Sequence, residues 1–185
     1  HNVFIALMVL INPGDEVILP APYWVSYIEM IRMAGGVPVV VDAEEAAGFK
    51  VTAEQVRAAV TPKTKLIIMN SPSNPTGMIY TREELEAIGR VCVENDLYII
   101  SDEIYCKLTY DGKEFTSMAA LGDEIKERTI LINGVSKTYA MTGWRIGFAA
   151  ANDRLAKVMA DYLSHSTSAA SMIYQYAALD AYSGP

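Results

Sequence analysis

The amino-acid sequence predicts an α/β fold: a mostly parallel sheet with helices on both faces, in a three-layer α/β/α arrangement. Short apolar runs alternate along the chain with longer amphipathic stretches, as strands and helices do in such folds. The short runs are apolar throughout, which is typical of strands covered on both faces. The 185 residues contain no internal repeat and no low-complexity linker, so we expect one domain with a sizeable core.

Each predicted strand corresponds to one of the short apolar runs. Their separation by helical stretches implies right-handed crossover connections, which make neighbouring strands parallel. In such sheets ligands bind beyond the carboxyl ends of the strands, so functional side chains are expected there. The predicted strands lie at residues 16–19, 37–41, 65–69, 97–100, 129–132 and 146–150.

Two of the predicted helices begin with a capping box, in which two side chains bond reciprocally to the first turn of the helix. Thr81 and Glu84 open a helix that runs to about residue 95, and Thr52 and Gln55 open another toward residue 59. Further helices are expected over the first eleven residues and over 153–182, the latter as two helices with a break near 164–171.

The composition is that of an ordinary globular protein. A net charge of -7 argues against nucleic acid or an anionic membrane as a partner, so a small metabolite fits better. The apolar start of the chain is too short to span a bilayer and has no charged leader. Cys92 and Cys106 lack metal-ligand spacing and are expected to be reduced thiols of a cytoplasmic protein. His1 and His165 lack companion ligands, so no metal site is expected.

Lys137 and Arg145 follow the predicted strand 129–132. A lysine can condense with a carbonyl as a Schiff base, and the planar arginine fork suits phosphate. The pair therefore points to a phosphorylated aldehyde, with pyridoxal 5'-phosphate as the natural cofactor. The alternative is a solvated lysine and a surface arginine in an ordinary loop.

Asp102 and Tyr105 follow the predicted strand 97–100. A buried carboxylate needs a cation or several donors, and a protonated pyridine nitrogen would be such a partner. Asp102 would keep that nitrogen charged, and Tyr105 would donate to the ring oxygen. The alternative is that Asp102 only caps a short following helix.

Two more strand ends carry groups that suit the same ligand. Asn74 lies in a loop rich in Pro, Ser and Asn after strand 65–69, where its amide could donate to a ring oxygen and to a substrate carboxylate. Trp24 follows strand 16–19 and could stack on a flat ring. The alternatives are a simple turn at Asn74 and core packing for the aromatics; we assign Tyr23 and Tyr27 to the core, with lining of the site as the alternative for both.

With these residues in place, the chain resembles the class I aminotransferases of the aspartate aminotransferase superfamily, the fold-type-I pyridoxal phosphate enzymes. The resemblance covers essentially the whole chain in the family's order. It is carried by Asn12-Pro13-Gly14-Asp15, Pro22-Tyr23-Trp24, Asn74-Pro75-Thr76-Gly77, Ser101-Asp102-Glu103-Ile104-Tyr105, Ser136-Lys137 and Gly143-Trp144-Arg145. It also implies cis peptides at Ala21-Pro22 and Asn74-Pro75.

The resemblance implies a role for each candidate residue. Lys137 would hold the cofactor as a Schiff base and later move the proton between the substrate's alpha carbon and the cofactor. Asp102 would pair with the pyridine nitrogen, and Tyr105 with the ring hydroxyl oxygen. Asn74 would contact that oxygen and the substrate's alpha carboxylate. Arg145 would bind the phosphate, and Trp24 would stack on the ring and contact substrate.

Two departures from the family pattern stand out. Many members carry a hydroxyl three residues before the lysine, where this chain has Gly134, so phosphate binding would depend more on Arg145. Residues 166–170 also differ from the stretch that reaches the partner subunit in relatives. The family's upstream phosphate cup and its small carboxyl-terminal domain are not in the sequence, so residues 1–185 are expected to be a cofactor-binding large domain, weakly active or inactive alone. The full-length protein is expected to be a homodimer.

The function expected from the resemblance is transfer of an amino group between an L-amino acid and a 2-oxo acid, with aspartate and 2-oxoglutarate as the best single pair. Alanine and kynurenine transaminases, beta-lyases and cyclopropane-forming synthases share the fold and stay open as alternatives. So does the ligand-sensing domain of a transcription regulator. A nicotinamide-binding dehydrogenase would need Gly-x-Gly-x-x-Gly after the first strand, which the sequence lacks.

Overall fold

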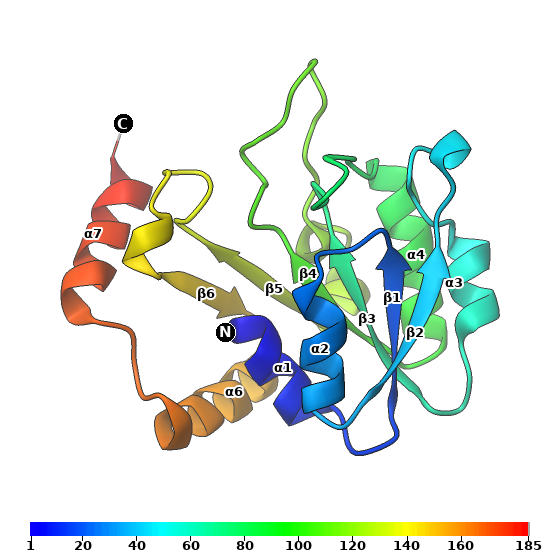
Figure 1. Ribbon diagram of the computed structural model, residues 1–185, viewed down its shortest axis with the longest axis horizontal. Helices are drawn as coiled ribbons and strands as arrows, with labels where there is room; N and C mark the ends of the chain where they lie inside the picture. Colours follow the sequence, from blue (N-terminus) through cyan, green and yellow to red (C-terminus); the bar gives the residue numbers. More distant parts are fainter. Residues whose placement is uncertain (185) are drawn as a thin grey trace.

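The chain folds around a single six-stranded sheet in the order β2-β1-β3-β4-β5-β6. The computed structural model describes residues 1–184, so Pro185 lies outside the described residues. The first five strands are parallel and β6 is antiparallel to β5 (Figure 1). The strands are β1 (Glu16–Ala21), β2 (Val37–Asp42), β3 (Thr64–Asn70), β4 (Tyr98–Asp102), β5 (Thr129–Gly134) and β6 (Gly147–Ala150). The predicted α/β class and mostly parallel sheet are therefore confirmed.

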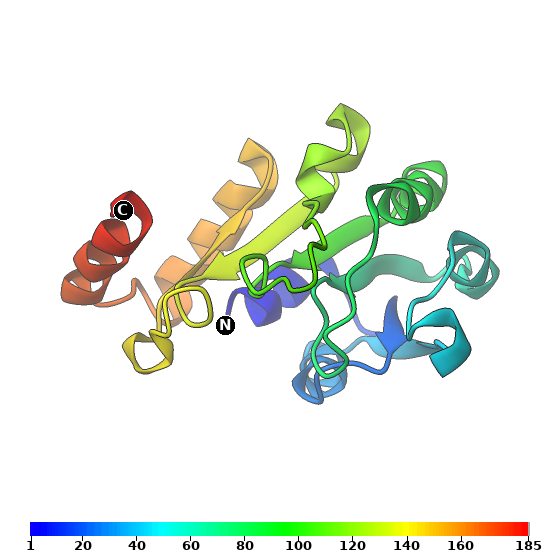
Figure 2. The ribbon, with the colours of Figure 1, turned by 90° about the horizontal axis from the view of Figure 1, so that it is seen from above.

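Helices cover both faces of this sheet, as Figure 2 shows for α1 and α2 on one side and α4 and α5 on the other. One buried apolar cluster joins the sheet to α1, α2 and α6, and a second joins it to α3, α4 and α5. The helices are α1 (Asn2–Leu10), α2 (Ser26–Met33), α3 (Ala53–Ala59), α4 (Arg82–Glu94), α5 (Asp123–Lys126), α6 (Asp153–Ser166) and α7 (Met172–Ser183).

Both predicted capping boxes are present. Thr81 Oγ1 accepts from the Glu84 N–H at 3.3 Å while Glu84 Oε2 accepts from the Thr81 N–H at 2.7 Å. Thr52 and Gln55 make the equivalent pair at 2.8 and 3.2 Å. Each box satisfies donors that the first helical turn leaves free, which fixes where α4 and α3 begin.

Helices α2 and α5 were not predicted, because each lacks the local signals that mark a helix. Neither has a side-chain hydrogen bond at its N-cap, and α5 is only four residues long. Packing forms α2 instead, through Tyr27 and Ile31, which are 2% and 0% exposed. The two predicted helices after residue 153 are confirmed as α6 and α7, and the Ala21–Pro22 and Asn74–Pro75 peptides are cis as expected, with Ser71–Pro72 also cis.

Parallel pairing aligns the strand ends that carry the candidate residues. Asn70 at the end of β3 is paired with Asp102 at the end of β4, and Asp102 is paired with Ile132 of β5. The antiparallel step from β5 to β6 then brackets the loop that carries Lys137 and Arg145. The polar ends of three neighbouring strands therefore meet at one edge of an apolar sheet.

Helix α7 stands apart from the sheet in both ribbon views (Figures 1 and 2). It contacts the rest of the chain through edge-to-face aromatic pairs, Tyr174 with Trp144 and Tyr182 with Tyr139 and Phe148, at centroid distances of 5.2 to 5.7 Å. Much of its apolar surface is exposed, including Met172, Ile173, Tyr176 and Leu179. No helix within residues 1–184 is long and apolar enough to cross a membrane.

Gly134 of β5 is paired with Gly147 of β6, and the two backbones lie close together there. A Cβ there would lie 2.7 Å from the Ile146 carbonyl oxygen and 2.8 Å from Gly147 Cα, and both are backbone atoms that cannot move aside alone. Gly134 stands where the family pattern has a hydroxyl-bearing residue, and at this position the chain has no room for any side chain.

We predict that Gly134→Ala lowers the free energy of unfolding by about 1–3 kcal/mol, because β6 must move away from β5. Gly143→Ala is the matched control, since a Cβ at Gly143 meets no atom within 4 Å. Urea denaturation of both variants gives the comparison. Equal stability of the two would contradict the packing argument.

Candidate active site

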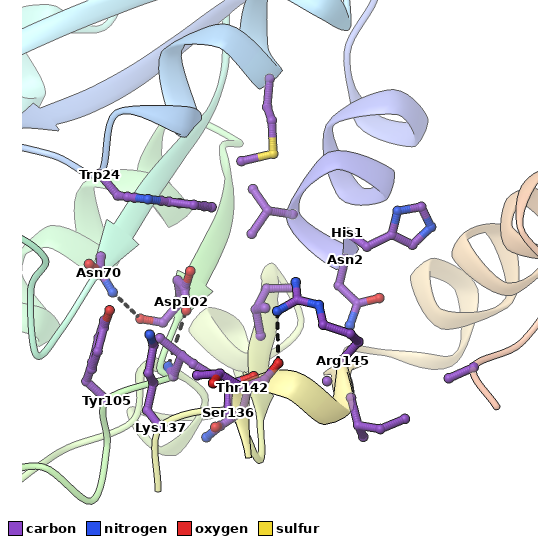
Figure 3. A pocket seen from close by; sticks show the side chains of 18 of the residues that line it. His1, Asn2, Trp24, Asn70, Asp102, Tyr105, Ser136, Lys137, Thr142 and Arg145 are labelled. Atoms are coloured by element: carbon purple, nitrogen blue, oxygen red, sulfur yellow. Dashed lines mark hydrogen bonds between the residues drawn. The ribbon is translucent and has the colours of Figure 1, made fainter. Parts of the chain in front are cut away.

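One cavity of about 690 Å³ opens at the carboxyl ends of the strands. Its size falls in the range of pockets that enclose a small organic ligand. All six residues singled out from the sequence line it, and Figure 3 shows five of them facing the same space. These six are Trp24, Asn74, Asp102, Tyr105, Lys137 and Arg145.

Asp102 is the buried acid of this cavity, only 7% exposed at the end of β4. Its Oδ2 accepts from the Tyr27 hydroxyl at 2.7 Å and its Oδ1 accepts from the Ile104 N–H at 3.2 Å. Burial raises the pKa of Asp102, and these two donors oppose the rise. The Ile104 contact resembles the capping role considered as an alternative, although it closes a turn rather than a helix.

Tyr27 is both a core residue and a lining residue. Its ring belongs to the buried cluster of α1, α2 and α6, while its hydroxyl meets Asp102 at the cavity. The preferred assignment to the core was therefore incomplete, and the alternative of lining the site also holds. Burial and then the negative charge of Asp102 raise the pKa of Tyr27 well above that of a free phenol, which keeps it a donor.

Asn70 is a cavity residue that sequence reasoning missed. Its Nδ2 donates to the Asp102 carbonyl oxygen at 2.9 Å, and its Oδ1 accepts from the Asn74 N–H at 2.8 Å. One side chain therefore joins the end of β4 to the loop that carries Asn74. An asparagine as the last residue of a buried strand was the available signal.

Lys137 brings an amine into the cavity from the loop after β5. Its Nζ lies 5.6 Å from the centroid of the Tyr105 ring, and Figure 3 shows the two side chains next to each other. The Tyr105 hydroxyl in turn meets Asn74 Nδ2 in a long contact of 3.5 Å. An amine, a phenol and an amide are thus grouped on the side of the cavity where β3, β4 and β5 end.

Arg145 supplies the cation at the other end of the cavity. It follows a short 3-10 turn, Thr142–Trp144, and takes a left-handed backbone conformation with φ of 55°. Such a conformation costs about 1–2 kcal/mol for a residue with a side chain, and strained residues of this kind cluster at functional sites. Its Nη1 donates to the Thr142 carbonyl at 3.0 Å, while the Trp144 ring packs edge to face against Tyr174.

Comparison with known proteins agrees with this geometry. Residues 1–185 match the family described as aminotransferase class I and II. The aspartate aminotransferase of Bacillus sp. (strain YM-2) is 55% identical over the whole chain, which covers 47% of that relative. The chain belongs to the aminotransferase class I and II family. It spans about half the length of the curated relatives that it matches.

Solved aminotransferase structures share the fold closely. The aspartate aminotransferase of Rhizobium meliloti superposes with a TM-score of 0.96 at 42% identity, covering 99% of this chain and 46% of that one. The aspartate aminotransferase of Thermus thermophilus, solved with maleate, superposes with a TM-score of 0.91 at 47% identity, covering 97% of this chain and 46% of that one. At these identities the likeness extends to the sequence as well as the fold.

Neither cysteine of this aminotransferase-family chain lines the cavity. Cys92 is buried in α4, and burial raises the pKa of its thiol to about 12, so it stays protonated. Cys106 is half-buried and its Sγ lies 3.3 Å from Asn133 Nδ2. Among residues 1–184 no group of three His, Cys, Asp or Glu side chains is placed to hold a metal ion.

Glu103 is a second buried carboxyl, next to Asp102 in the chain, and its contacts could not be predicted from the sequence. Its Oε1 accepts from the Ser101 and Ser117 hydroxyls at 2.9 and 2.8 Å and from the Met118 N–H at 3.2 Å. It therefore ties the end of β4 to a segment that returns fifteen residues later. Burial raises the pKa of Glu103, and the three donors oppose that rise.

We predict that stability falls as pH rises through the folded-state pKa of Glu103. Because that pKa lies above the ordinary value of 4.5, the folded chain binds the proton more tightly than the unfolded chain does. The stabilisation is complete below pH 4.5 and is lost as pH rises. Asp102 acts in the same direction, so Glu103→Gln should flatten the dependence only in part.

Urea denaturation at a series of pH values measures this slope. Glu124→Gln, an exposed change on α5, is the control and should leave the slope as in the unmodified protein. A Glu103→Gln variant with an unchanged slope would show that Glu103 does not titrate differently in the folded chain.

Proposed function

We propose that this chain is the cofactor-binding large domain, residues 1–185, of a pyridoxal phosphate-dependent aminotransferase that exchanges an amino group between L-aspartate and 2-oxoglutarate. The observation that carries the proposal is the convergence of Asp102, Lys137 and Arg145 on one cavity. An acid, an amine and a guanidinium match the ring nitrogen, aldehyde and phosphate of that cofactor in number and in chemistry.

The cavity suits the cofactor in its donors as well as in its size. Arg145 would bind phosphate, to which its fork is matched, and Trp24 would stack on the flat ring. Tyr105 and Asn74 would donate to the ring hydroxyl oxygen, since their polar atoms already lie within 3.5 Å of each other. Asp102 would accept from the ring nitrogen, which is the cation that a buried carboxylate needs.

Bound pyridoxal phosphate supplies an aldehyde that condenses with amines and a protonated ring that withdraws electrons. Lys137 Nζ would hold the aldehyde carbon of the cofactor, and when a substrate amine takes that place the freed Lys137 amine would move the proton from the substrate's alpha carbon to the cofactor. Asp102 would keep the positive charge on the ring nitrogen. Asn74 would also orient the substrate's alpha carboxylate, with Trp24 packing beside it.

The substrate pair rests on similarity to aspartate aminotransferases and on the chemistry of maleate in the Thermus structure. Maleate is a four-carbon dicarboxylate, as the carbon skeleton of aspartate is. We propose a cytoplasmic homodimer as the working form, on the basis of the family to which the chain belongs. Spectral titration of the full-length protein with a panel of amino acids tests the choice: aspartate should convert the bound cofactor fastest, and a faster reaction with alanine or kynurenine would reassign the substrate.

We predict that Lys137→Ala removes the visible absorbance of covalently bound cofactor and lowers turnover by about a thousandfold or more, because the attaching amine and the proton carrier are one group. Lys126→Ala, on α5, is the control. Absorbance scans and steady-state rates of the full-length variants measure both effects. Retained absorbance and rate in Lys137→Ala would refute the proposed role.

We predict that Asp102→Ala keeps the covalent attachment at Lys137 but slows proton removal from the substrate by about a hundredfold or more, since the ring nitrogen loses its counter-charge. The comparison is between the absorbance of the bound cofactor and the rate of a single half-reaction with aspartate. Normal half-reaction kinetics in this variant would remove Asp102 from the mechanism.

A further inference from the structure

We propose that Tyr27 is a positioning residue that fixes the Asp102 carboxylate in the orientation and ionisation state needed to receive a cationic ring nitrogen. The inference rests on the function proposed above and adds a residue that acts through Asp102 rather than on substrate. Its starting point is the buried 2.7 Å hydrogen bond between residues 75 positions apart in sequence.

The contact is not incidental to packing. The Tyr27 side chain is 2% exposed and lies within an apolar cluster, where a hydroxyl without a partner would be costly. The hydroxyl's hydrogen bond is to Asp102 Oδ2, where this cluster borders the cavity. A phenylalanine would fill the same space, so the hydroxyl is present for the carboxylate.

Two donors hold the carboxylate from two sides. The Tyr27 hydroxyl occupies one lone pair of Oδ2, and the Ile104 N–H occupies one of Oδ1. Each carboxylate oxygen can accept again, so both retain a free lone pair for a donor from the cavity. The two bonds also fix the plane of the carboxylate, because rotation about its last torsion would break both.

The same two bonds favour the ionised acid. Burial by itself raises the pKa of Asp102, and the Tyr27 hydroxyl is foremost among the groups that lower it again. Without that donor, the acid would more readily keep its own proton and would lose the charge that attracts a cationic nitrogen. The phenol therefore favours a buried negative charge on Asp102 before any ligand arrives.

Tyr27 also contacts the surface on which a flat ring would stack. The rings of Trp24 and Tyr27 meet edge to face, with centroids 5.3 Å apart and planes at 90°. Figure 3 shows the Trp24 indole above the space between Asp102 and Lys137. Tyr27 therefore contacts both Trp24, on which the ring would stack, and Asp102, which would pair with the ring nitrogen.

The test compares Tyr27→Phe with Tyr80→Phe in the full-length protein. Tyr80 is the matched control, because its buried hydroxyl also makes one hydrogen bond, from the Val51 N–H at 3.0 Å, in the apolar cluster on the other face of the sheet. Tyr27→Phe should weaken pyridoxal phosphate binding about tenfold and lower turnover about tenfold, with the KM for aspartate changed less than about threefold. Tyr80→Phe should change melting temperature only.

A spectroscopic readout separates positioning from general destabilisation. With pyridoxal phosphate carrying ¹⁵N in the ring, the nitrogen signal of the bound cofactor should move toward the neutral form in Tyr27→Phe and stay in place in Tyr80→Phe. If Tyr27→Phe does not fold, Tyr27→Met also fills the space without a donor and takes its place. A nitrogen signal and affinity equal to those of the unmodified protein would overturn the inference.

A double-mutant cycle provides the last step. In an Asp102→Ala background, Tyr27→Phe should cost no further cofactor affinity, because the group it acts through is gone. An equal loss in both backgrounds would overturn the inference and assign Tyr27 a structural role. Failure of the unmodified protein to bind pyridoxal phosphate would instead overturn the proposed function, so the two failures are distinguishable.

Discussion

The carboxylate of Asp102, buried at the end of a central strand, is the constraint around which the cavity is built. An ionised acid in an apolar interior is unstable unless its surroundings compensate. Here the carboxylate accepts hydrogen bonds from the Tyr27 hydroxyl on α2 and from the Ile104 N–H in the following turn. Asn70 in addition donates to the backbone carbonyl of Asp102. Three separate parts of the chain must be in place before this one side chain is tolerated.

The parallel sheet makes that arrangement possible. Its inner strands are apolar on both faces, so polar groups are confined to the strand ends, and parallel pairing brings those ends to one edge. At this edge the rigid sheet continues into loops that can carry reactive groups. Lys137 and Arg145 lie on such a loop, held between β5 and β6.

Local signals explain what could be predicted from sequence. Capping boxes at Thr52 and Thr81 and continuous apolar runs each involve neighbouring residues, so the main strands and helices were predicted correctly. The six cavity residues were found because each follows a strand in a fold whose strand ends converge. Helix α2 escaped prediction because tertiary packing, rather than a cap, determines it.

The supporting contacts could not be found in the same way. Glu103 meets Met118 across fifteen residues and Tyr27 meets Asp102 across 75, and nothing in the local sequence pairs them. A buried tyrosine in a helix shows the same sequence pattern whether or not its hydroxyl binds another side chain. The need for glycine at 134 likewise arises only when β6 returns beside β5.

Helix α7 has a practical consequence for anyone who handles residues 1–185 alone. Its outward aliphatic and aromatic groups, among them Ile173 and Tyr176, meet water instead of a neighbouring surface. Large exposed apolar areas favour aggregation. Mild detergent or a soluble fusion partner would therefore help to keep the purified polypeptide in solution. Aggregation of that polypeptide would reflect the exposed surface of α7 rather than a fault in the well-packed sheet.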